Sequence, residues 1–268
     1  MGMLINIDNG GTLTDICVLK DNNFYTTKTL TTPYDLSKCF FDGLKDVSKA
    51  VYGQEDVTRL LAEVEHIRYS TTQGTNAIVE RKGPKLGMVV NKGNVKLIKL
   101  MQEEDPELFT FLVGDRIEEI DLADLDDEVS AAETITSITR LTARGANRVV
   151  VCFDNDDATH CESQFKRIAF NSYPRHLLGA VPMLFASELV EDISSNRRGW
   201  TALINSFLHP AMESFLYNAE NRLREYRTKN PLLIFRNDGD ASRVAKTIAL
   251  KTYSSGPRGG MEGVKEFS

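Results

Sequence analysis

Apolar residues alternate with polar ones at the start of the chain, which is the spacing of a β-strand with one buried face. Residues 4–7 follow this pattern, a polar turn at residues 8–11 interrupts it, and a second apolar run occupies residues 16–19. Alternation on both sides of a glycine-rich turn predicts a β-hairpin. Residues 24–30 continue with aromatic and β-branched side chains after another turn, so three antiparallel strands are expected to open the chain.

The spacing of apolar residues then changes to that of a helix. Thr32 and Pro33 offer a hydroxyl N-cap and a proline at the first helical position. Apolar side chains follow three or four positions apart, at Leu36, Phe40, Leu44, Val47 and Val51. This stripe predicts an amphipathic helix against the sheet, and residues 57–64 repeat it in a shorter helix.

Strands and helices alternate through the middle of the chain. Strands are expected at 66–70, 85–90, 148–153 and 181–186, and helices at 92–101, 134–143 and 161–170. The acidic stretch 102–133, with its run at 124–128, is expected to form a solvated face and connecting loops. The order of these elements predicts an α/β fold.

From Ser194 onward the apolar spacing is mainly helical. Helical stripes lie on both sides of Pro210, and because proline removes a backbone hydrogen bond, the helix is expected to kink or split there. A short buried strand is expected at 232–235. A second glycine-rich stretch, residues 254–263, is expected to form a loop.

Composition and charge narrow the class of protein. With 268 residues, of which 41% are hydrophobic, the chain can bury a core large enough for one large domain or two small ones. The net charge of −6 and the lack of a long basic run argue against a nucleic-acid or anionic-membrane surface. No apolar segment reaches the roughly 20 residues needed to span a bilayer, so the chain is expected in the cytoplasm.

The cysteines and histidines show no metal-ligand spacing. Cys17, Cys39, Cys152 and Cys161 are far apart in the sequence and form no C-x-x-C pair. Cys17 and Cys152 lie in apolar runs, where a free thiol behaves as a small core residue. We therefore expect reduced, structural cysteines and no zinc site.

The turn after the first strand carries side chains suited to a phosphate, namely Asp8, Gly10, Gly11, Thr12, Thr14 and Asp15. Its glycines have no Cβ, so a phosphate can approach the backbone N–H groups closely, and its threonines add hydroxyl donors. Its carboxylates are acceptors only, so beside a phosphate they need a cation, most plausibly Mg²⁺. The alternative is an ordinary Asn-Gly-Gly hairpin turn, which favours these residues for backbone reasons alone.

Four polar residues follow the strand expected at 66–70, namely Thr71, Thr72, Thr75 and Asn76. They fall in a turn before a helix expected to run through Glu80. The first backbone N–H groups of a helix have no partner within the helix and suit an anion or a substrate carbonyl. From the residues alone, a threonine that only caps this helix is the simpler interpretation.

Three blocks resemble, in the same order, the hydantoinase A/5-oxoprolinase family of the actin, Hsp70 and sugar-kinase superfamily. D-N-G-G-T-L-T-D at residues 8–15 resembles the D-x-G-G-T-x-T-D phosphate loop of that family. Residues 70–83, S-T-T-Q-G-T-N-A-I-V-E-R-K-G, are similar to its H-G-T-T-x-x-T-N-A-x-x-E-R-x-G block. Residues 255–260, S-G-P-R-G-G, are similar to its S-G-P-A-G-G block, and weaker likeness at 187–190 and 205–210 fills the interval.

The resemblance implies a fold and a partner. The fold is a ribonuclease-H-like mixed sheet with flanking helices and an incomplete second half. Residues 1–185 would form the N-terminal α/β domain, and residues 186–268 the mainly helical start of the core domain, truncated before a second phosphate loop. The implied partner is a chain that carries the second half of the ATPase fold, a hydantoinase B-like subunit, or both.

The activity implied by the resemblance is ATP-dependent hydrolysis of a cyclic amide of the hydantoin or 5-oxoproline type, or ATP-dependent carboxylation of a ketone. ATP phosphorylates an amide or enolate oxygen, and the activated carbon is then hydrolysed or carboxylated. The residues that would face the reacting group are Thr71, Thr72, Thr75 and Asn76. The first loop would bind the ATP phosphates together with Gly256, Gly259 and Gly260, and the Mg²⁺ ligands would be Asp8 and Asp15.

Two departures from the family pattern keep another class of function open. Tyr69 and Ser70 stand where the family has His-Gly, which removes a possible acid–base group, and Arg258 replaces a small residue. The alternative is therefore a non-catalytic subunit or fragment that keeps the fold without turnover. A sugar or acetate kinase would fit the first loop but not the two later blocks.

Overall fold

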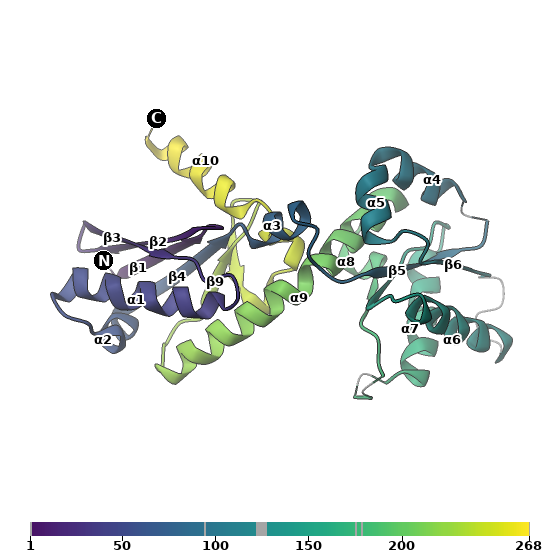
Figure 1. Cartoon of the computed structure of the whole chain (residues 1–268), viewed down its shortest axis with the longest axis horizontal. Helices are drawn as coiled ribbons and strands as arrows, with labels where there is room; N and C mark the ends of the chain where they lie inside the picture. Colours follow the sequence, from purple (N-terminus) through teal and green to yellow (C-terminus); the bar gives the residue numbers. More distant parts are fainter. Residues whose placement is uncertain (1, 94, 122–127, 175, 178, 268) are drawn as a thin grey trace. The chain divides into compact units, whose positions relative to one another are not determined.

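The computed structural model describes residues 2–93, 95–121, 128–174, 176–177 and 179–267, and the chain forms two compact units (Figure 1). Unit 1 consists of Met1–Lys82 and Leu208–Ser268, and unit 2 of Gly83–Phe207. These units differ from the expected sequence segments 1–185 and 186–268, because the chain leaves unit 1 after Lys82 and returns to it at Leu208.

Unit 1 contains a six-stranded mixed sheet in the order β10-β9-β4-β1-β2-β3. Its strands are β1 (Met3–Asn9), β2 (Leu13–Lys20), β3 (Asn23–Leu30), β4 (Val64–Thr71), β9 (Leu232–Phe235) and β10 (Ala241–Arg243). β1 pairs antiparallel with β2, with Leu4 opposite Leu19 and Ile7 opposite Ile16, and β2 pairs antiparallel with β3. β4 lies parallel to β1, and β9 parallel to β4. The antiparallel opening and the ribonuclease-H-like mixed sheet are therefore confirmed.

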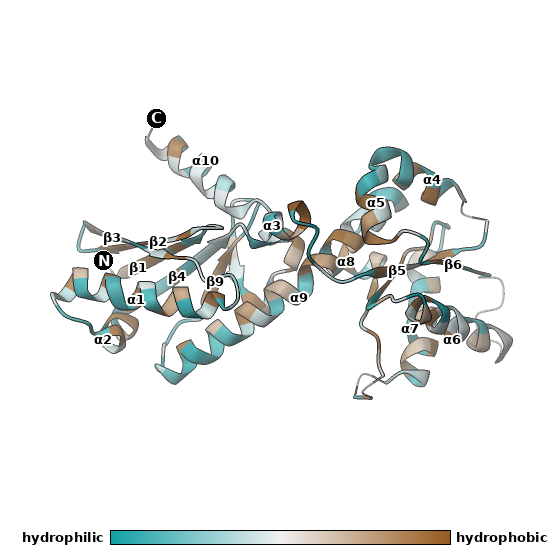
Figure 2. Ribbon diagram, viewed as in Figure 1, coloured by the Kyte–Doolittle hydropathy of each residue, from teal (hydrophilic) through white to brown (hydrophobic). Residues whose placement is uncertain are grey.

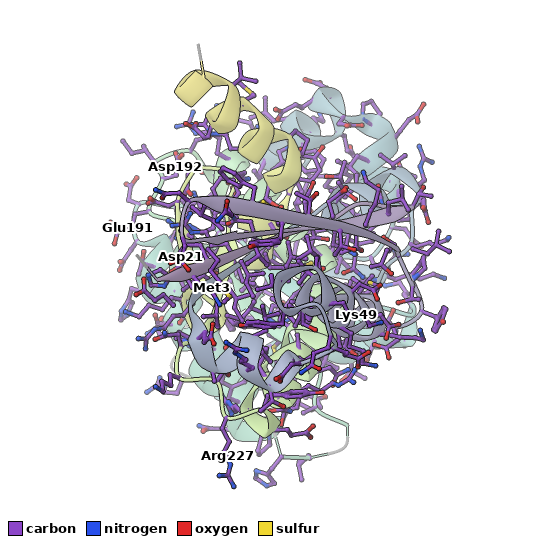
Figure 3. The ribbon with its side chains drawn as sticks, turned by 90° about the vertical axis from the view of Figure 1, so that its left-hand side faces the viewer. Met3, Asp21, Lys49, Glu191, Asp192 and Arg227 are labelled. Carbon is purple, nitrogen blue, oxygen red and sulfur yellow. The ribbon has the colours of Figure 1, made fainter. Side chains whose placement is uncertain are left out.

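Helices complete unit 1. They are α1 (Leu36–Tyr52), α2 (Val57–Glu63), α3 (Gln73–Val79), α10 (Ser255–Phe267) and the short 3₁₀ turns η1 (Val244–Lys246) and η2 (Ala249–Thr252). Figure 2 shows hydrophobic and hydrophilic positions alternating around α1, as expected for a helix with one buried face. The ring of Phe40 on α1 is fully buried, with its centroid 6.0 Å from that of Tyr69 on β4. Charged side chains such as Asp21 and Lys49, labelled in Figure 3, are exposed.

The first helix begins later than its sequence predicts. Asp35 caps α1, because its carboxylate accepts a hydrogen bond from the backbone N–H of Ser37 (3.0 Å). Thr32, the expected cap, instead accepts a hydrogen bond from the backbone N–H of Cys39 (3.1 Å). The expectation of a Thr32-Pro33 helix start is therefore wrong, since a carboxylate closer to the helix takes the capping position.

α9 (Ser195–Glu225) continues through Pro210, so the expected split of this helix is wrong. Proline removes one backbone hydrogen bond, whereas Leu208 and Met212 on either side are only 1% and 2% exposed. Burying side chains of this size contributes about 2 kcal/mol each, which outweighs the loss of one hydrogen bond. Among the described residues, neither α9 nor any other helix is long and apolar enough to cross a membrane.

Unit 2 contains a four-stranded parallel sheet in the order β6-β5-β7-β8. Its elements are β5 (Leu86–Asn91), α4 (Val95–Glu104), α5 (Pro106–Leu112), β6 (Ile117–Ile120), α6 (Glu128–Ala143), β7 (Arg148–Val151), α7 (Ala158–Ser172), β8 (Met183–Phe185) and α8 (Ala186–Leu189). The stretch 102–133, expected to be connecting loops, contains α5 and β6, with Phe109 and Ile120 buried. Frequent acidic residues hid these apolar positions, and residues 124–127 of the acidic run lie outside the described part of the chain.

Glu162 is a buried carboxyl group in unit 2. It is 1% exposed and accepts hydrogen bonds from the backbone N–H of Phe153 (3.1 Å) and of Ser187 (2.9 Å) and from Oγ of Ser187 (2.6 Å). Burial raises the pKa of Glu162 above its ordinary value of 4.5, because the charged form loses its hydration. The carboxyl group joins the segment after β7 to the start of α8.

This raised pKa predicts a pH dependence of stability. Because the folded state holds the Glu162 proton more tightly than the unfolded chain, the stabilisation is fully present below pH 4.5 and is lost as pH rises through the folded pKa. The free energy of unfolding of the wild type, relative to Glu162→Gln, should therefore fall as pH rises above 4.5. Urea unfolding of both proteins across this range measures the difference, and a difference independent of pH would contradict the prediction.

Candidate functional site

The three predicted sequence blocks meet in unit 1 at one edge of the sheet. β1, β4 and β9 are parallel, so their carboxyl ends lie at the same edge, which is where open α/β sheets bind ligands. The first loop, residues 10–12, follows β1, and the second loop, residue 72 and the start of α3, follows β4. α10 begins beside them, with Oγ of Ser255 3.2 Å from the backbone nitrogen of Thr71.

Asn9 holds the first loop to the second. Its side chain is 2% exposed, and its Nδ2 donates a hydrogen bond to Oγ1 of Thr14 (2.7 Å) while its Oδ1 accepts one from Oγ1 of Thr71 (3.3 Å). Its backbone carbonyl accepts a hydrogen bond from the backbone N–H of Thr72 (3.0 Å). Both partner hydroxyls are buried, with Thr14 0% and Thr71 1% exposed. In this structure these two threonines therefore bind Asn9 and face away from solvent.

The S-G-P-R-G-G block forms the first turns of α10 and not the expected loop. Oγ of Ser255 is fully buried and donates a hydrogen bond to the carbonyl of Thr71 (3.3 Å). Oγ1 of Thr75 accepts a hydrogen bond from the backbone N–H of Ser254 (3.3 Å). Pro257 is tolerated because it lies in the first helical turn, where a backbone N–H needs no partner within the helix. Thr75 thus joins α10 to the second loop.

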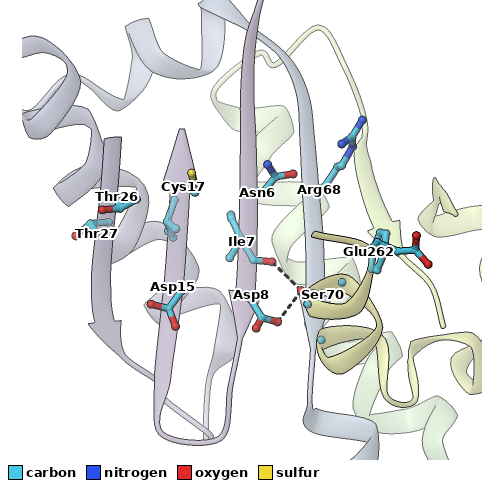
Figure 4. Close-up of a pocket in the computed structure, with 15 residues that line it drawn as sticks. Asn6, Ile7, Asp8, Asp15, Cys17, Thr26, Thr27, Arg68, Ser70 and Glu262 are labelled. Atoms are coloured by element: carbon cyan, nitrogen blue, oxygen red, sulfur yellow. Dashed lines mark hydrogen bonds between the residues drawn. The ribbon is translucent and has the colours of Figure 1, made fainter. Parts of the chain in front are cut away.

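A cavity of about 390 Å³, here called the carboxylate cavity, lies between the sheet and α10 (Figure 4). Asp8 and Asp15 stand opposite each other on β1 and β2, and both line it. Oγ of Ser70 donates a hydrogen bond to Oδ1 of Asp8 (2.6 Å), and Nζ of Lys28 lies 2.6 Å from Oδ1 of Asp15. Two acidic oxygen ligands on neighbouring strands therefore face one open space.

The glycines of α10 bring that helix close to the sheet. A Cβ on Gly256 would lie 3.1 Å from Oδ1 of Asp8, and a Cβ on Gly259 would lie 3.4 Å from Cε1 of Phe235. Both glycines, together with Gly260, line the carboxylate cavity. Their lack of a side chain keeps the cavity open where α10 approaches the strands.

A second cavity of about 480 Å³, here called the amide cavity, lies beside the first loop. Its polar lining comes from both loops and includes Gly10, Gly11, Thr12, Thr72 and Asn76. The two cavities share no lining residue. The first loop therefore borders two separate spaces, one with carboxylates and one with neutral polar groups.

The two departures from the family pattern have different surroundings. Tyr69 is 1% exposed, and burial raises the pKa of its phenol well above the usual value of 10.0, so the group stays protonated. It packs against the ring of Phe215, with the centroids 4.6 Å apart, and belongs to the core. Ser70 lies on the other face of β4 and binds Asp8. No acid–base group replaces the histidine at this position.

The sequence interpretation found most of this edge but missed three residues that organise it: Asn9, Ser70 and Ser255. Asn9 was detectable, because the alternation that puts Ile5 and Ile7 inward also puts residue 9 inward. The other two became visible only through contacts with segments far away in the sequence. Among the described residues, no group of three or more His, Cys, Asp or Glu side chains could hold a metal ion.

Comparisons with known proteins match nearly the whole chain. A sequence-family model described as "Hydantoinase/oxoprolinase N-terminal region" matches residues 4–169, and one described as "Hydantoinase/oxoprolinase" matches residues 198–268. The chain is 27% identical to the acetophenone carboxylase gamma subunit of Aromatoleum aromaticum, with 98% of this chain and 39% of that subunit covered. It is 24% identical to 5-oxoprolinase 1 of Arabidopsis thaliana, with 97% of this chain and 23% of that protein covered.

Solved structures share the fold. A nucleotide-free acetone carboxylase gives a TM-score of 0.80 at 20% identity, with 99% of this chain and 40% of that chain covered. The ATP-dependent caprolactamase from Pseudomonas jessenii gives a TM-score of 0.79 at 22% identity, with 99% of this chain and 41% of that chain covered. The chain thus spans about two fifths or less of the length of these related proteins.

Proposed function

Because the chain belongs to the hydantoinase/oxoprolinase family, we propose that it supplies the first phosphate-binding half of an ATP-dependent enzyme that hydrolyses a cyclic amide or carboxylates a ketone. The observation that carries the proposal is the convergence of three separate sequence blocks on one strand edge, around Asp8, Gly10 and Gly11. The ATP-dependent relatives with this fold support the same activity. The family's other portion would come from a partner, either a chain with the second half of the ATPase fold or a hydantoinase B-like subunit.

The proposed roles follow the geometry of the loops. Gly10, Gly11 and Thr12 would bind phosphate oxygens through the backbone and a hydroxyl, since no Cβ blocks the approach at either glycine. Gly256, Gly259 and Gly260 would border the same phosphates from α10. Thr14, Thr71 and Thr75 would act by positioning, because their hydroxyls bind Asn9 and Ser254. Thr72 and Asn76 would face the reacting group.

The carboxylate cavity fits Mg²⁺ of the kind that accompanies ATP. Mg²⁺ prefers oxygen ligands, keeps several waters and is usually held by one or two carboxylates together with substrate phosphates. Asp8 and Asp15 would hold it, and it would neutralise the charge on the transferring phosphoryl group. All four cysteines are free thiols, which fits the reducing cytoplasm as the proposed compartment.

A subunit without turnover is the second candidate. It is favoured by Tyr69, whose buried phenol cannot replace the family's histidine as an acid–base group. The two candidates differ in one measurement, ATP hydrolysis by the chain plus partner with amide or ketone substrates. Substrate-dependent hydrolysis supports the enzyme, and nucleotide binding without hydrolysis supports the non-catalytic subunit.

Calorimetry with Mg·ATP tests the binding part of the proposal. The full chain alone is expected to bind weakly, because one loop holds only one side of the triphosphate, and a partner polypeptide that covers the rest of the family fold should restore binding. Tight stoichiometric binding without the partner would contradict the need for a second half. No binding in either case would contradict the phosphate assignment.

A further inference from the structure

The amide cavity has an uncharged interior. Among the described residues that line it, only Glu80 and Lys82 carry a charge, and their side chains pair with each other at 2.7 Å. Both are exposed, at 51% and 78%, so they lie at the rim. A carboxylate or phosphate in this cavity would lose hydration without meeting an unpaired cation. The lining therefore favours an uncharged ligand.

The interior also has an apolar side. Pro33, Leu36, Ala77 and Ala211 line the cavity beside the polar loop residues. Leu36 is 6% exposed, so its side chain forms part of a packed wall. A volume of about 480 Å³ with one apolar side and a few polar groups suits a small, compact molecule.

Asn76 provides a carboxamide at the boundary with the first loop. Its Nδ2 donates to Oγ1 of Thr72 over a long distance of 3.4 Å, and its Oδ1 accepts no hydrogen bond from the described residues. A Cβ on Gly11 would lie only 3.0 Å from Nδ2, so glycine at that position leaves room for the carboxamide. Asn76 thus retains one N–H donor and one carbonyl acceptor side by side.

Resting on the proposed function, we infer that the amide cavity binds an uncharged cyclic amide, with Asn76 as its recognition residue. A lactam has a cis amide bond, so its N–H and C=O groups lie next to each other on one edge. That edge complements a carboxamide through two parallel hydrogen bonds, one in each direction. A ketone offers only the acceptor, and a lactam with a carboxylate adds a charge that the cavity does not neutralise. The methylene groups of the ring would contact the apolar side.

The test is a titration of the isotope-labelled full chain with ε-caprolactam, followed by NMR of the side-chain amide of Asn76. We expect saturable shifts at Asn76 and Thr72. N-methylcaprolactam, which lacks the N–H, should bind at least about tenfold more weakly, since one hydrogen bond is lost and one acceptor is left unpaired. Cyclohexanone and 5-oxoproline should also bind at least about tenfold more weakly than the lactam.

Matched variants separate recognition from folding. Asn76→Leu should abolish the lactam shifts at Thr72, whereas Asn218→Leu, the same change at an exposed helical position of unit 1, should keep them. Equal affinity for caprolactam and its N-methyl analogue, tighter binding of the ketone or of 5-oxoproline, or no saturable shift at Asn76 would each overturn the inference. The titration contains no nucleotide, so its failure is distinguishable from failure of Mg·ATP to bind.

Discussion

Gly11→Val is expected to reduce Mg·ATP affinity by at least about a hundredfold, or ~2.7 kcal/mol, when the partner polypeptide is present. A Cβ at this position would lie 3.0 Å from Nδ2 of Asn76, and a branched side chain would also cover the backbone N–H groups that a phosphate must approach. The backbone of Gly11 has an ordinary negative φ, so the loss should arise from blocked approach and not from a strained fold. Calorimetry on the reconstituted protein measures the change.

Gly179→Val is the matched control for this variant. A Cβ on Gly179 would meet no atom within 4 Å, and this residue lies in unit 2, apart from the three loops. The control should bind Mg·ATP as the wild type does. If Gly11→Val also bound normally, the backbone of the first loop would not contact the phosphates and the proposed function would lose its main element.

Asn9→Leu should lower the free energy of unfolding by about 3 kcal/mol. Leucine has a similar size but cannot donate to Thr14 or accept from Thr71, so two buried hydroxyl groups lose a partner. The backbone bond from Thr72 to residue 9 would remain, but the junction of the two loops would rest on it alone. Urea unfolding measures the loss, and hydrogen exchange at Gly10, Gly11 and Thr72 should become faster.

Asn6→Leu makes the same change two residues... earlier on β1, where the side chain is exposed. It should change stability by no more than about 0.5 kcal/mol. Equal effects at positions 6 and 9 would show that the strand tolerates leucine generally and that Asn9 has no special role in joining the loops.

Local pattern sufficed for the elements whose partners are near in sequence. The β1–β2 hairpin followed from alternation, and its register pairs Ile7 with Ile16 as the apolar positions require. Local pattern failed where distant residues decide the structure. Tyr69 pairs in register with Ile234 across the inserted unit 2, and no periodicity in either segment could reveal that the chain divides in this way.

The candidate site shows the same division. Composition and resemblance identified the loops, because glycines, hydroxyls and carboxylates reflect chemistry that is readable in sequence. They did not separate exposed groups such as Thr12 from buried ones such as Thr14, since burial depends on which face of β2 each side chain occupies. The helical start of α10 was also missed, because its glycines and proline normally indicate a loop.

The most direct test of the account is the location of Mg·ATP on the isotope-labelled chain with the partner polypeptide present. We predict that the backbone amide resonances of Gly10, Gly11, Thr12 and Gly256 shift together on titration, because the three blocks border one phosphate site. Shifts confined to unit 2, for example at Gly93 and Gly145, with these four resonances unmoved, would contradict it.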